Sequence, residues 1–223
     1  MKVYAEFIDD NGLLFRTKTL LQYGDSWDLI GSIVMKNPGS AKPGTPLNED
    51  SKIGISEFYA EDINFENWTE ASNDPTLKKV AAIFDGSYLE KNIELDGIIQ
   101  VFNIYNICEP KIKFAYQKAE NSNTDLLFIN LNKTIKQFRN KPVYLGFFDF
   151  YTFKKTRHSD YLQSISKGIF DSCEYPAAAD KDESGTPIIT SALIGCSFAK
   201  IFPNSLRFKW TLAPSKVVSG LEK

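Results

Sequence analysis

The chain has 223 residues, 43% hydrophobic and 13% aromatic, which is enough apolar surface to bury a core without disulfide bonds or a structural metal. The formal net charge is −2, but residues 1–100 hold 9 Lys and Arg against 17 Asp and Glu, whereas the rest of the chain holds 17 against 11. A basic second half could face phosphates, although a mixed surface charge is the simpler interpretation of these counts.

The lone histidine, His158, excludes H-E-x-x-H metalloproteases, multi-histidine metal sites and kinases with an H-R-D motif. It lies in a basic segment, and we interpret it as part of a solvated turn rather than as a catalytic base. Cys108, Cys173 and Cys196 are widely spaced without a C-x-x-C motif, which is typical of reduced cytoplasmic thiols. Without a signal peptide or a membrane-spanning apolar run, we expect a cytoplasmic protein with no membrane partner, no cofactor and no metal.

Two short strands open the chain. Residues 3–8 alternate between apolar and polar, residues 9–12 (Asp-Asp-Asn-Gly) are a turn signal, and the alternation resumes over residues 13–20. This pattern predicts an N-terminal β-hairpin. In the second strand the residues expected on one face are Phe15, Thr17 and Thr19.

A buried strand predicted over residues 30–35 ends in Asn37-Pro38-Gly39-Ser40, and the functional prediction rests on this turn. Pro38 fixes its own φ and favours an extended Asn37, while Gly39 permits a positive φ or a close approach of the backbone to a ligand. Open α/β sheets bind ligands at the carboxyl ends of their strands. We therefore predict a ligand-binding site here, with Pro38, Gly39 and Ser40 in its wall.

Residues 43–73 combine acidic residues, Gly, Pro and Asn with scattered aromatics, which predicts a long loop or short helices covering the turn, as functional lids do. The next segment, Asn73-Asp74-Pro75-Thr76, has the pattern of a helix N-terminus. We expect Asp74 and Thr76 to lie beside the Asn37 turn, where the helix dipole favours an anionic ligand.

Further apolar runs predict core strands over residues 98–103, ending at Asn103, and 143–147. Helices are predicted shortly after Pro110, over residues 123–139 and over 160–171, and a further strand over 188–194, with the ordered part ending in 205–212. Strands that alternate with helices predict a three-layer α/β sandwich with a mostly parallel central sheet and an antiparallel N-terminal hairpin. We expect one domain over 1–223: the hairpin in 1–27, the core over about 28–172 and a variable part in 173–223.

Three motifs in order resemble an uncharacterised prokaryotic and phage family over roughly residues 29–150. The motifs are the Asn37-Pro38-Gly39-Ser40-Ala41 turn, the Asp74-Pro75-Thr76 helix start and the Val101-Phe102-Asn103 strand end. Members of that family carry N-P-S-x-A, D-P-T and V-x-N at the corresponding points. The family has no established activity, so this resemblance adds Asn103 to the predicted site without naming a reaction.

More distantly, the chain is similar to the uracil-DNA glycosylase superfamily, especially its mismatch-specific branch. That branch has an N-P-G turn after its first core strand, which Asn37-Pro38-Gly39 matches, and a later strand ending in L-G, which Leu145-Gly146 resembles. The segment Phe202-Pro203-Asn204-Ser205 resembles its final N-P-S loop, which adds Asn204 and Ser205 to the predicted site. The resemblance implies a glycosylase-like fold, with Asn37 positioning the hydrolytic water.

Several functions remain open at this point. A glycosylase-like hydrolase of a nucleobase or nucleotide needs an oriented water, backbone amides and an aromatic face, for which Phe58, Tyr59 and Phe102 are candidates. The alternatives are a non-catalytic module that binds nucleic acid or a small nucleotide-like ligand in the same crevice, and a protein-interaction module that uses the hairpin. Acidic residues abound, but no spacing singles out a catalytic carboxylate pair.

Overall fold

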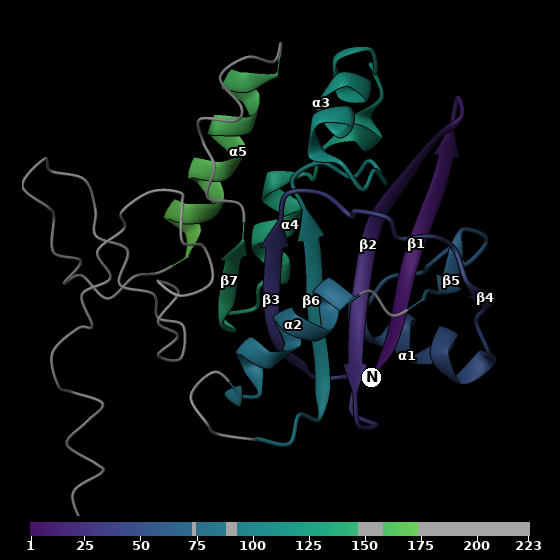
Figure 1. Ribbon diagram of the computed structural model, residues 1–223. Coiled ribbons are helices and arrows are strands. Elements are labelled where there is room, and N and C mark those ends of the chain that lie inside the picture. The colour runs from purple at the N-terminus through teal and green to yellow at the C-terminus, as the bar shows by residue number, and fades with distance from the viewer. Residues whose placement is uncertain (73–74, 88–92, 147–157, 174–223) are drawn as a thin grey trace, which may run out of the picture.

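The computed structural model describes residues 1–72, 75–87, 93–146 and 158–173, which form a mixed α/β fold around one seven-stranded sheet (Figure 1). The strand order is β4-β5-β1-β2-β6-β3-β7. In chain order the elements are β1 (Lys2–Asp10), β2 (Leu13–Tyr23), β3 (Leu29–Met35), β4 (Thr45–Pro46), α1 (Glu49–Tyr59), β5 (Trp68–Glu70), α2 (Pro75–Phe84), β6 (Gly97–Asn103), α3 (Ile112–Glu120), the 3-10 helix η2 (Asp125–Leu127), α4 (Leu131–Gln137), β7 (Val143–Gly146) and α5 (Ser159–Ser172). The predicted site residues Asp74, Asn204 and Ser205, and the segments predicted over 188–194 and 205–212, lie outside the described residues.

The predicted N-terminal hairpin forms from β1 and β2, and its turn residues explain why. Asn11 and Gly12 both have positive φ angles, 55° and 76°, as a two-residue type I′ turn requires. The pairing of β1 with β2 is interrupted at Thr17, where β2 carries one extra residue as a β-bulge. The hairpin is an integral part of the sheet rather than an addition to it, because β2 also pairs with β6.

The predicted parallel core is confirmed for three strands, since β3 pairs in parallel with both β6 and β7. The predicted mostly parallel sheet is wrong, because the pairs β1–β2, β1–β5, β2–β6 and β4–β5 are all antiparallel. A continuous apolar run indicates that both faces of a strand are covered, and it does not reveal the direction of the neighbouring strands. All seven residues of β6 are buried, although β6 has one parallel and one antiparallel neighbour.

Helices cover both faces of this sheet (Figure 1). On one face, Leu77 and Phe84 of α2 pack in a cluster with Val101 of β6. On the other face, Phe58 of α1 packs in a cluster with Ile98 of β6, and residues of α4 and α5 continue the core beyond it. We call these the α2 face and the α1 face. Successive side chains of β6 point alternately to these two faces, so residues two positions apart on this strand can share a site.

The local helix predictions hold in part. Helices α3 and α5 form where they were expected, but the helix predicted over residues 123–139 is divided into η2 and α4. Thr124 caps η2 through its hydroxyl and Asn130 caps α4 by accepting a hydrogen bond from the Lys133 amide at 3.0 Å, so each of the two helices has its own start. Residues 43–73, predicted as a long loop or short helices, contain the helix α1, as well as the unpredicted strands β4 and β5.

Candidate functional site

The carboxyl ends of β3 and β6 lie side by side, and they bring the Asn37 turn next to Asn103. Asn103 is the register partner of Met35, and the backbone amide of Ile104 donates to the carbonyl of Met35 at 2.8 Å. The turn has the backbone expected from the sequence, because Gly39 has a φ of +67°. We call this region the carboxyl edge.

Asn37 is tied into the structure by its side chain. The side chain is half-buried, and its Nδ2 donates a hydrogen bond to the backbone carbonyl of Glu109 at 2.7 Å. Glu109 is fixed in turn, because its carboxylate binds the ammonium group of Lys118 at 2.7 Å, which also holds the pKa of that carboxyl below its usual range. The amide of Asn37 therefore connects the end of β3 to the segment before α3.

Asn103 is buried on the α2 face of the sheet. It follows Val101 by two residues, and the alternation of a strand places both side chains on one face. The Asn103 side chain is 2% exposed, and its Oδ1 finds no hydrogen-bond donor within the described part of the chain. A buried amide oxygen without a hydrogen-bond donor costs free energy. A donor to Asn103 Oδ1 would therefore stabilise this side chain.

Two further polar residues on the α2 face were not predicted as site residues: Arg16 and Thr19 of β2. Arg16 stands directly opposite Phe7, and Thr19 stands opposite Val101, both of which belong to the core on the α2 face. Arg16 is 3% exposed and Thr19 is fully buried. The hydroxyl of Thr19 has no hydrogen-bond partner among the described residues. Asn103 shares this face with them, and we call the three residues the buried polar cluster.

The buried polar cluster lies at the carboxyl edge because the chain leaving β6 runs back along β2. The backbone amide of Arg16 donates to the carbonyl of Asn106 at 2.8 Å, and the amide of Cys108 donates to the carbonyl of Leu14 at 2.9 Å. Burial raises the pKa of the Cys108 thiol to about 11, and the positive charges of Arg16 and Lys118 oppose that rise. The thiol is therefore protonated at neutral pH and acts as a core residue.

The β-bulge at Thr17 explains why the sequence pattern missed Arg16. Simple alternation places Phe15, Thr17 and Thr19 together and puts Arg16 on the other face. The extra residue reverses the alternation, so that Arg16 and Thr19 lie on the α2 face while Phe15 packs in the cluster on the α1 face. A bulge leaves no reliable mark in the sequence, so the pairing with β1 was needed to find this site.

The remaining predicted site residues are divided among several environments. Pro38 is buried, Gly39 is half-buried and Ser40 is exposed. Ala41, which follows the turn, belongs to the same cluster as Leu77 in the first helical turn of α2, and the expected neighbourhood of the turn and the start of this helix stays a prediction. Thr76 belongs to α2, but its side chain lies outside what the structure describes.

The aromatic residues considered as candidates for stacking on a base belong to the core. Phe58, Tyr59 and Phe102 are 3%, 7% and 7% exposed, and the ring of Phe102 meets that of Phe138 edge to face at 5.6 Å. All three lie on the α1 face, opposite the buried polar cluster. Their burial in the core leaves these three candidates without a surface for stacking on a base.

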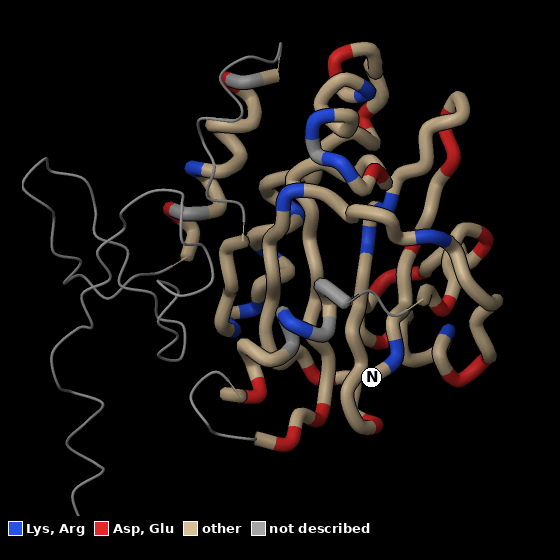
Figure 2. Tube along the Cα trace, viewed as in Figure 1, with Lys and Arg blue, Asp and Glu red and all other residues tan. Residues whose placement is uncertain are grey.

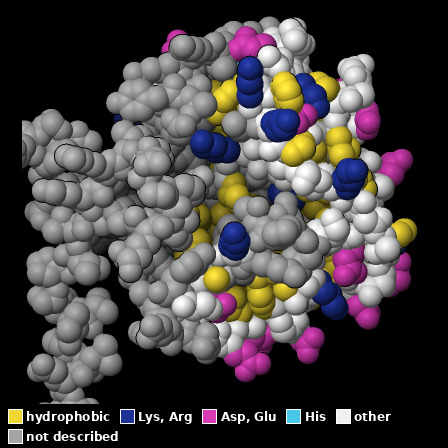
Figure 3. Space-filling view, viewed as in Figure 1, with side chains coloured by type: hydrophobic (Ala, Val, Ile, Leu, Met, Phe, Trp, Pro, Cys, Tyr) yellow, Lys and Arg dark blue, Asp and Glu magenta, His cyan; other side chains and the backbone are white. Residues whose placement is uncertain are grey.

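Charge is distributed unevenly around the carboxyl edge. Figure 2 shows Lys and Arg on β2, on the loop after β3 and on α3, all near this edge, while Asp and Glu gather around α1 and β5. Figure 3 views the molecule from the α2 side, and Lys and Arg side chains lie across the upper part of that face. The surroundings of the buried polar cluster are therefore more favourable to an anion than those of α1 and β5.

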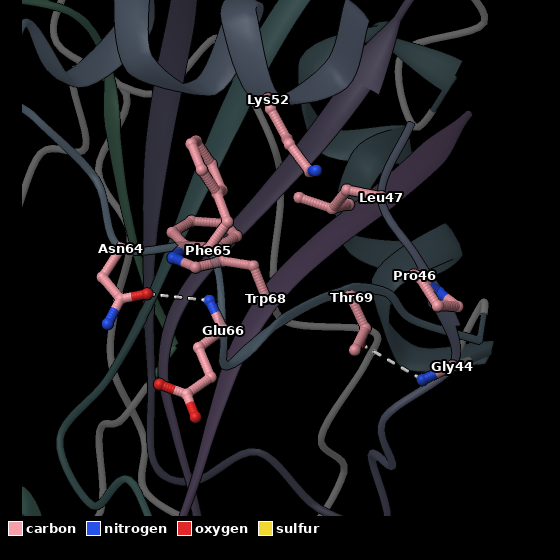
Figure 4. Close-up of a pocket in the computed structure, with 9 residues that line it drawn as sticks. All are labelled: Gly44, Pro46, Leu47, Lys52, Asn64, Phe65, Glu66, Trp68 and Thr69. Atoms are coloured by element: carbon pink, nitrogen blue, oxygen red, sulfur yellow. Dashed lines mark hydrogen bonds between the residues drawn. The ribbon is translucent and has the colours of Figure 1, made fainter. Parts of the chain in front are cut away.

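A pocket of about 510 Å³ lies elsewhere, between α1, β4 and β5 (Figure 4). Its wall includes Leu47, Lys52, Phe65, Trp68 and Thr69, and none of the predicted site residues. In the sheet, β1 and β2 separate β5 from β6, so this pocket is distinct from the carboxyl edge. Asn37 and Asn103 at the carboxyl edge were predicted by motif and strand order, whereas no sequence pattern indicated this pocket.

The described residues contain no group of three or more His, Cys, Asp and Glu side chains that could hold a metal ion. Within the same ranges, every helix is too short or too polar to cross a bilayer. Comparisons with protein-family models, with curated proteins and with solved structures find no match to this chain.

Proposed function

We propose that the chain is a binding module for a small anionic, nucleotide-like ligand, held at the carboxyl edge by the buried polar cluster. The observation that carries this proposal is the burial of Arg16 on the same face as Asn103 and Thr19, whose side-chain oxygens lack partners among the described residues. Arg16 brings a positive charge to this face, and a phosphate is an acceptor that the planar donors of a guanidinium fit well.

Each member of the cluster supplies a different part of the recognition. The guanidinium of Arg16 would bind the anionic group, Asn103 Oδ1 would accept an N–H from the ligand, and the hydroxyl of Thr19 can donate or accept. The N-terminus of α2, which we expect near the turn, would add to the attraction for an anion. Because all three side chains are buried, binding requires the segments that cover them to move.

The glycosylase-like hydrolase remains the competing proposal, supported by the match of Asn37-Pro38-Gly39 to the mismatch-specific branch and by the position of this turn at a core strand end. Two observations weaken it. The Nδ2 of Asn37 is already engaged with Glu109, and the aromatic candidates are buried on the opposite face of the sheet. A role of the hairpin edge in protein interaction has less support, because β1 is paired on both sides.

One set of experiments distinguishes the binding proposal from the hydrolase proposal. Calorimetric titrations with inorganic phosphate, uridine and uridine 5′-monophosphate test binding, and base release from uracil-containing and mismatched oligonucleotides tests catalysis. The binding proposal expects saturable binding of the monophosphate without base release. Base release that Asn37→Ala abolishes would instead support the hydrolase, and the absence of both activities would contradict both proposals.

A further inference from the structure

The pocket between α1, β4 and β5 has a buried aromatic side chain in its wall. Trp68 is 2% exposed, its ring meets that of Tyr59 at 6.0 Å and that of Phe65 at 6.4 Å, and the ammonium group of Lys18 lies 5.8 Å from the ring centre. Leu47, which is 9% exposed, adds an aliphatic surface to the wall. A volume of about 510 Å³ with such walls is in the range of small-molecule sites.

Trp68 also carries a hydrogen-bond donor that no described residue satisfies. The indole Nε1 of Trp68 is buried and has no hydrogen-bond acceptor among the residues that the structure describes. A buried donor without an acceptor costs about 1–3 kcal/mol, so Trp N–H groups usually find a partner. Neighbouring polar groups are already engaged: Asn64 Oδ1 accepts from the Glu66 amide at 3.0 Å, and Thr69 Oγ1 accepts from the Gly44 amide at 3.2 Å.

The charged groups of the pocket indicate the sign of its ligand. Figure 4 shows the ammonium group of Lys52 facing the space beside Leu47 and Phe65, whereas the carboxylate of Glu66 is turned away from Lys52. Lys52 binds Glu49 at 2.6 Å, but the Glu49 side chain is 80% exposed, and such surface pairs contribute little. The ammonium group therefore has donors to offer an anion that enters the pocket.

We propose that this pocket is a second binding site, which takes a small molecule with an apolar ring and one carboxylate group. Lys52 is the partner of the carboxylate, while Phe65, Trp68 and Leu47 enclose the ring. The acidic residues around α1 and β5 repel molecules with several negative charges, so a monocarboxylate fits better than a nucleotide (Figure 2). This site does not depend on the function proposed for the carboxyl edge.

Isothermal titration calorimetry with indole-3-acetate, in parallel with tryptamine, tests the assignment. The two probes share a ring system and differ in charge. We expect indole-3-acetate to bind and tryptamine to bind at least about tenfold more weakly, since a hydrogen bond to a charged group is worth about 1.5–3 kcal/mol. Lys52→Met should weaken indole-3-acetate about tenfold, whereas Lys133→Met, an exposed lysine in the first turn of α4, should leave its affinity unchanged.

Lys52 lies in the first turn of α1 and is partly exposed, so its replacement should leave the fold intact, and circular dichroism checks this. Three results would each overturn the assignment. They are no saturable binding of indole-3-acetate by the wild type, equal affinity for tryptamine, or equal loss of binding in the Lys133→Met control. Nucleotide titrations of Lys52→Met, expected to match the wild type, show whether the two sites are independent.

Discussion

The side-chain amide of Asn37 donates a hydrogen bond to the backbone carbonyl of Glu109, 72 positions along the chain, at 2.7 Å. This contact gives the asparagine of the N-P-G motif a structural role. The N-P-G turn lies at a parallel strand end, as expected, but its asparagine joins two segments of the fold. The side-chain oxygens of Thr19 and Asn103, which have no partner among the described residues, lie on the α2 face.

Replacement of Asn37 by alanine should therefore lower stability. We expect Asn37→Ala to reduce the free energy of unfolding by about 1–2 kcal/mol, because it leaves the half-buried Glu109 carbonyl without its donor. Urea denaturation followed by circular dichroism measures the change, with Ser40→Ala in the same turn as an exposed control. Unchanged stability would remove the structural role assigned to this amide and leave Asn37 free for chemistry.

Gly39 provides a second test of the turn. Its φ of +67° is a conformation that L residues with a Cβ atom adopt at a cost of roughly 1 kcal/mol. Gly39→Ala should lower the urea midpoint accordingly, and Gly39→Asn should lower it less, because asparagine tolerates this conformation better. Equal stability of both variants and the wild type would show that the turn does not hold this backbone in solution.

The stability of the protein should depend on Cys108 at high pH. Burial raises the pKa of its thiol to about 11, so the folded state holds the proton more tightly than the unfolded chain does. The resulting stabilisation is fully present below the unfolded pKa of about 8.5, and it is lost as pH rises toward the folded value. Unfolding free energies between neutral pH and about pH 10.5 should fall less steeply in Cys108→Ala than in the wild type. Parallel pH profiles would contradict this.

Gly44 should be intolerant of any side chain, for a reason of space rather than backbone angle. A Cβ atom at this position would lie 1.9 Å from the carbonyl oxygen of Glu70, which belongs to β5. Gly44→Ala should separate β4 from β5, lower the melting temperature and weaken indole-3-acetate binding, while Lys42→Ala on the same exposed segment should do neither. An alanine variant with wild-type melting and binding would contradict the close approach of these strands.

Much of the fold could be predicted because its signals are local. The Asn11-Gly12 turn and the apolar runs of β3, β6 and β7 identify the hairpin and the parallel strands. What could not be predicted depends on contacts between distant segments. The antiparallel pairing of β2 with β6 fixes most of the sheet, and the bulge at Thr17 decides which way Arg16 points.

The residues of the candidate site likewise divide into those with local sequence signals and those that depend on contacts between distant segments. The Asn37 turn and Asn103 were predicted from motif and strand ends, because the carboxyl ends of parallel strands meet at one edge. Arg16 and Thr19 were missed because their face depends on the bulge, and the pocket around Trp68 was missed because β4 and β5 are two and three residues long. Such short strands have no periodicity to detect.

The central claim is that Arg16 recognises a ligand phosphate. The most direct measurement is the difference in affinity between uridine 5′-monophosphate and uridine, for the wild type, for Arg16→Met and for the control Arg139→Met. Arg139 is on the α1 face, where its guanidinium lies 4.6 Å from the ring centre of Phe58, so its loss should affect stability but not binding.

We predict that the monophosphate binds the wild type and Arg139→Met at least about tenfold more tightly than uridine, and that this preference disappears in a folded Arg16→Met. Nuclear magnetic resonance spectra of the variants confirm that they are folded, and Arg16→Lys, which retains the charge, should keep part of the preference. The absence of a phosphate preference in the wild type, or an undiminished preference in folded Arg16→Met, would contradict the account.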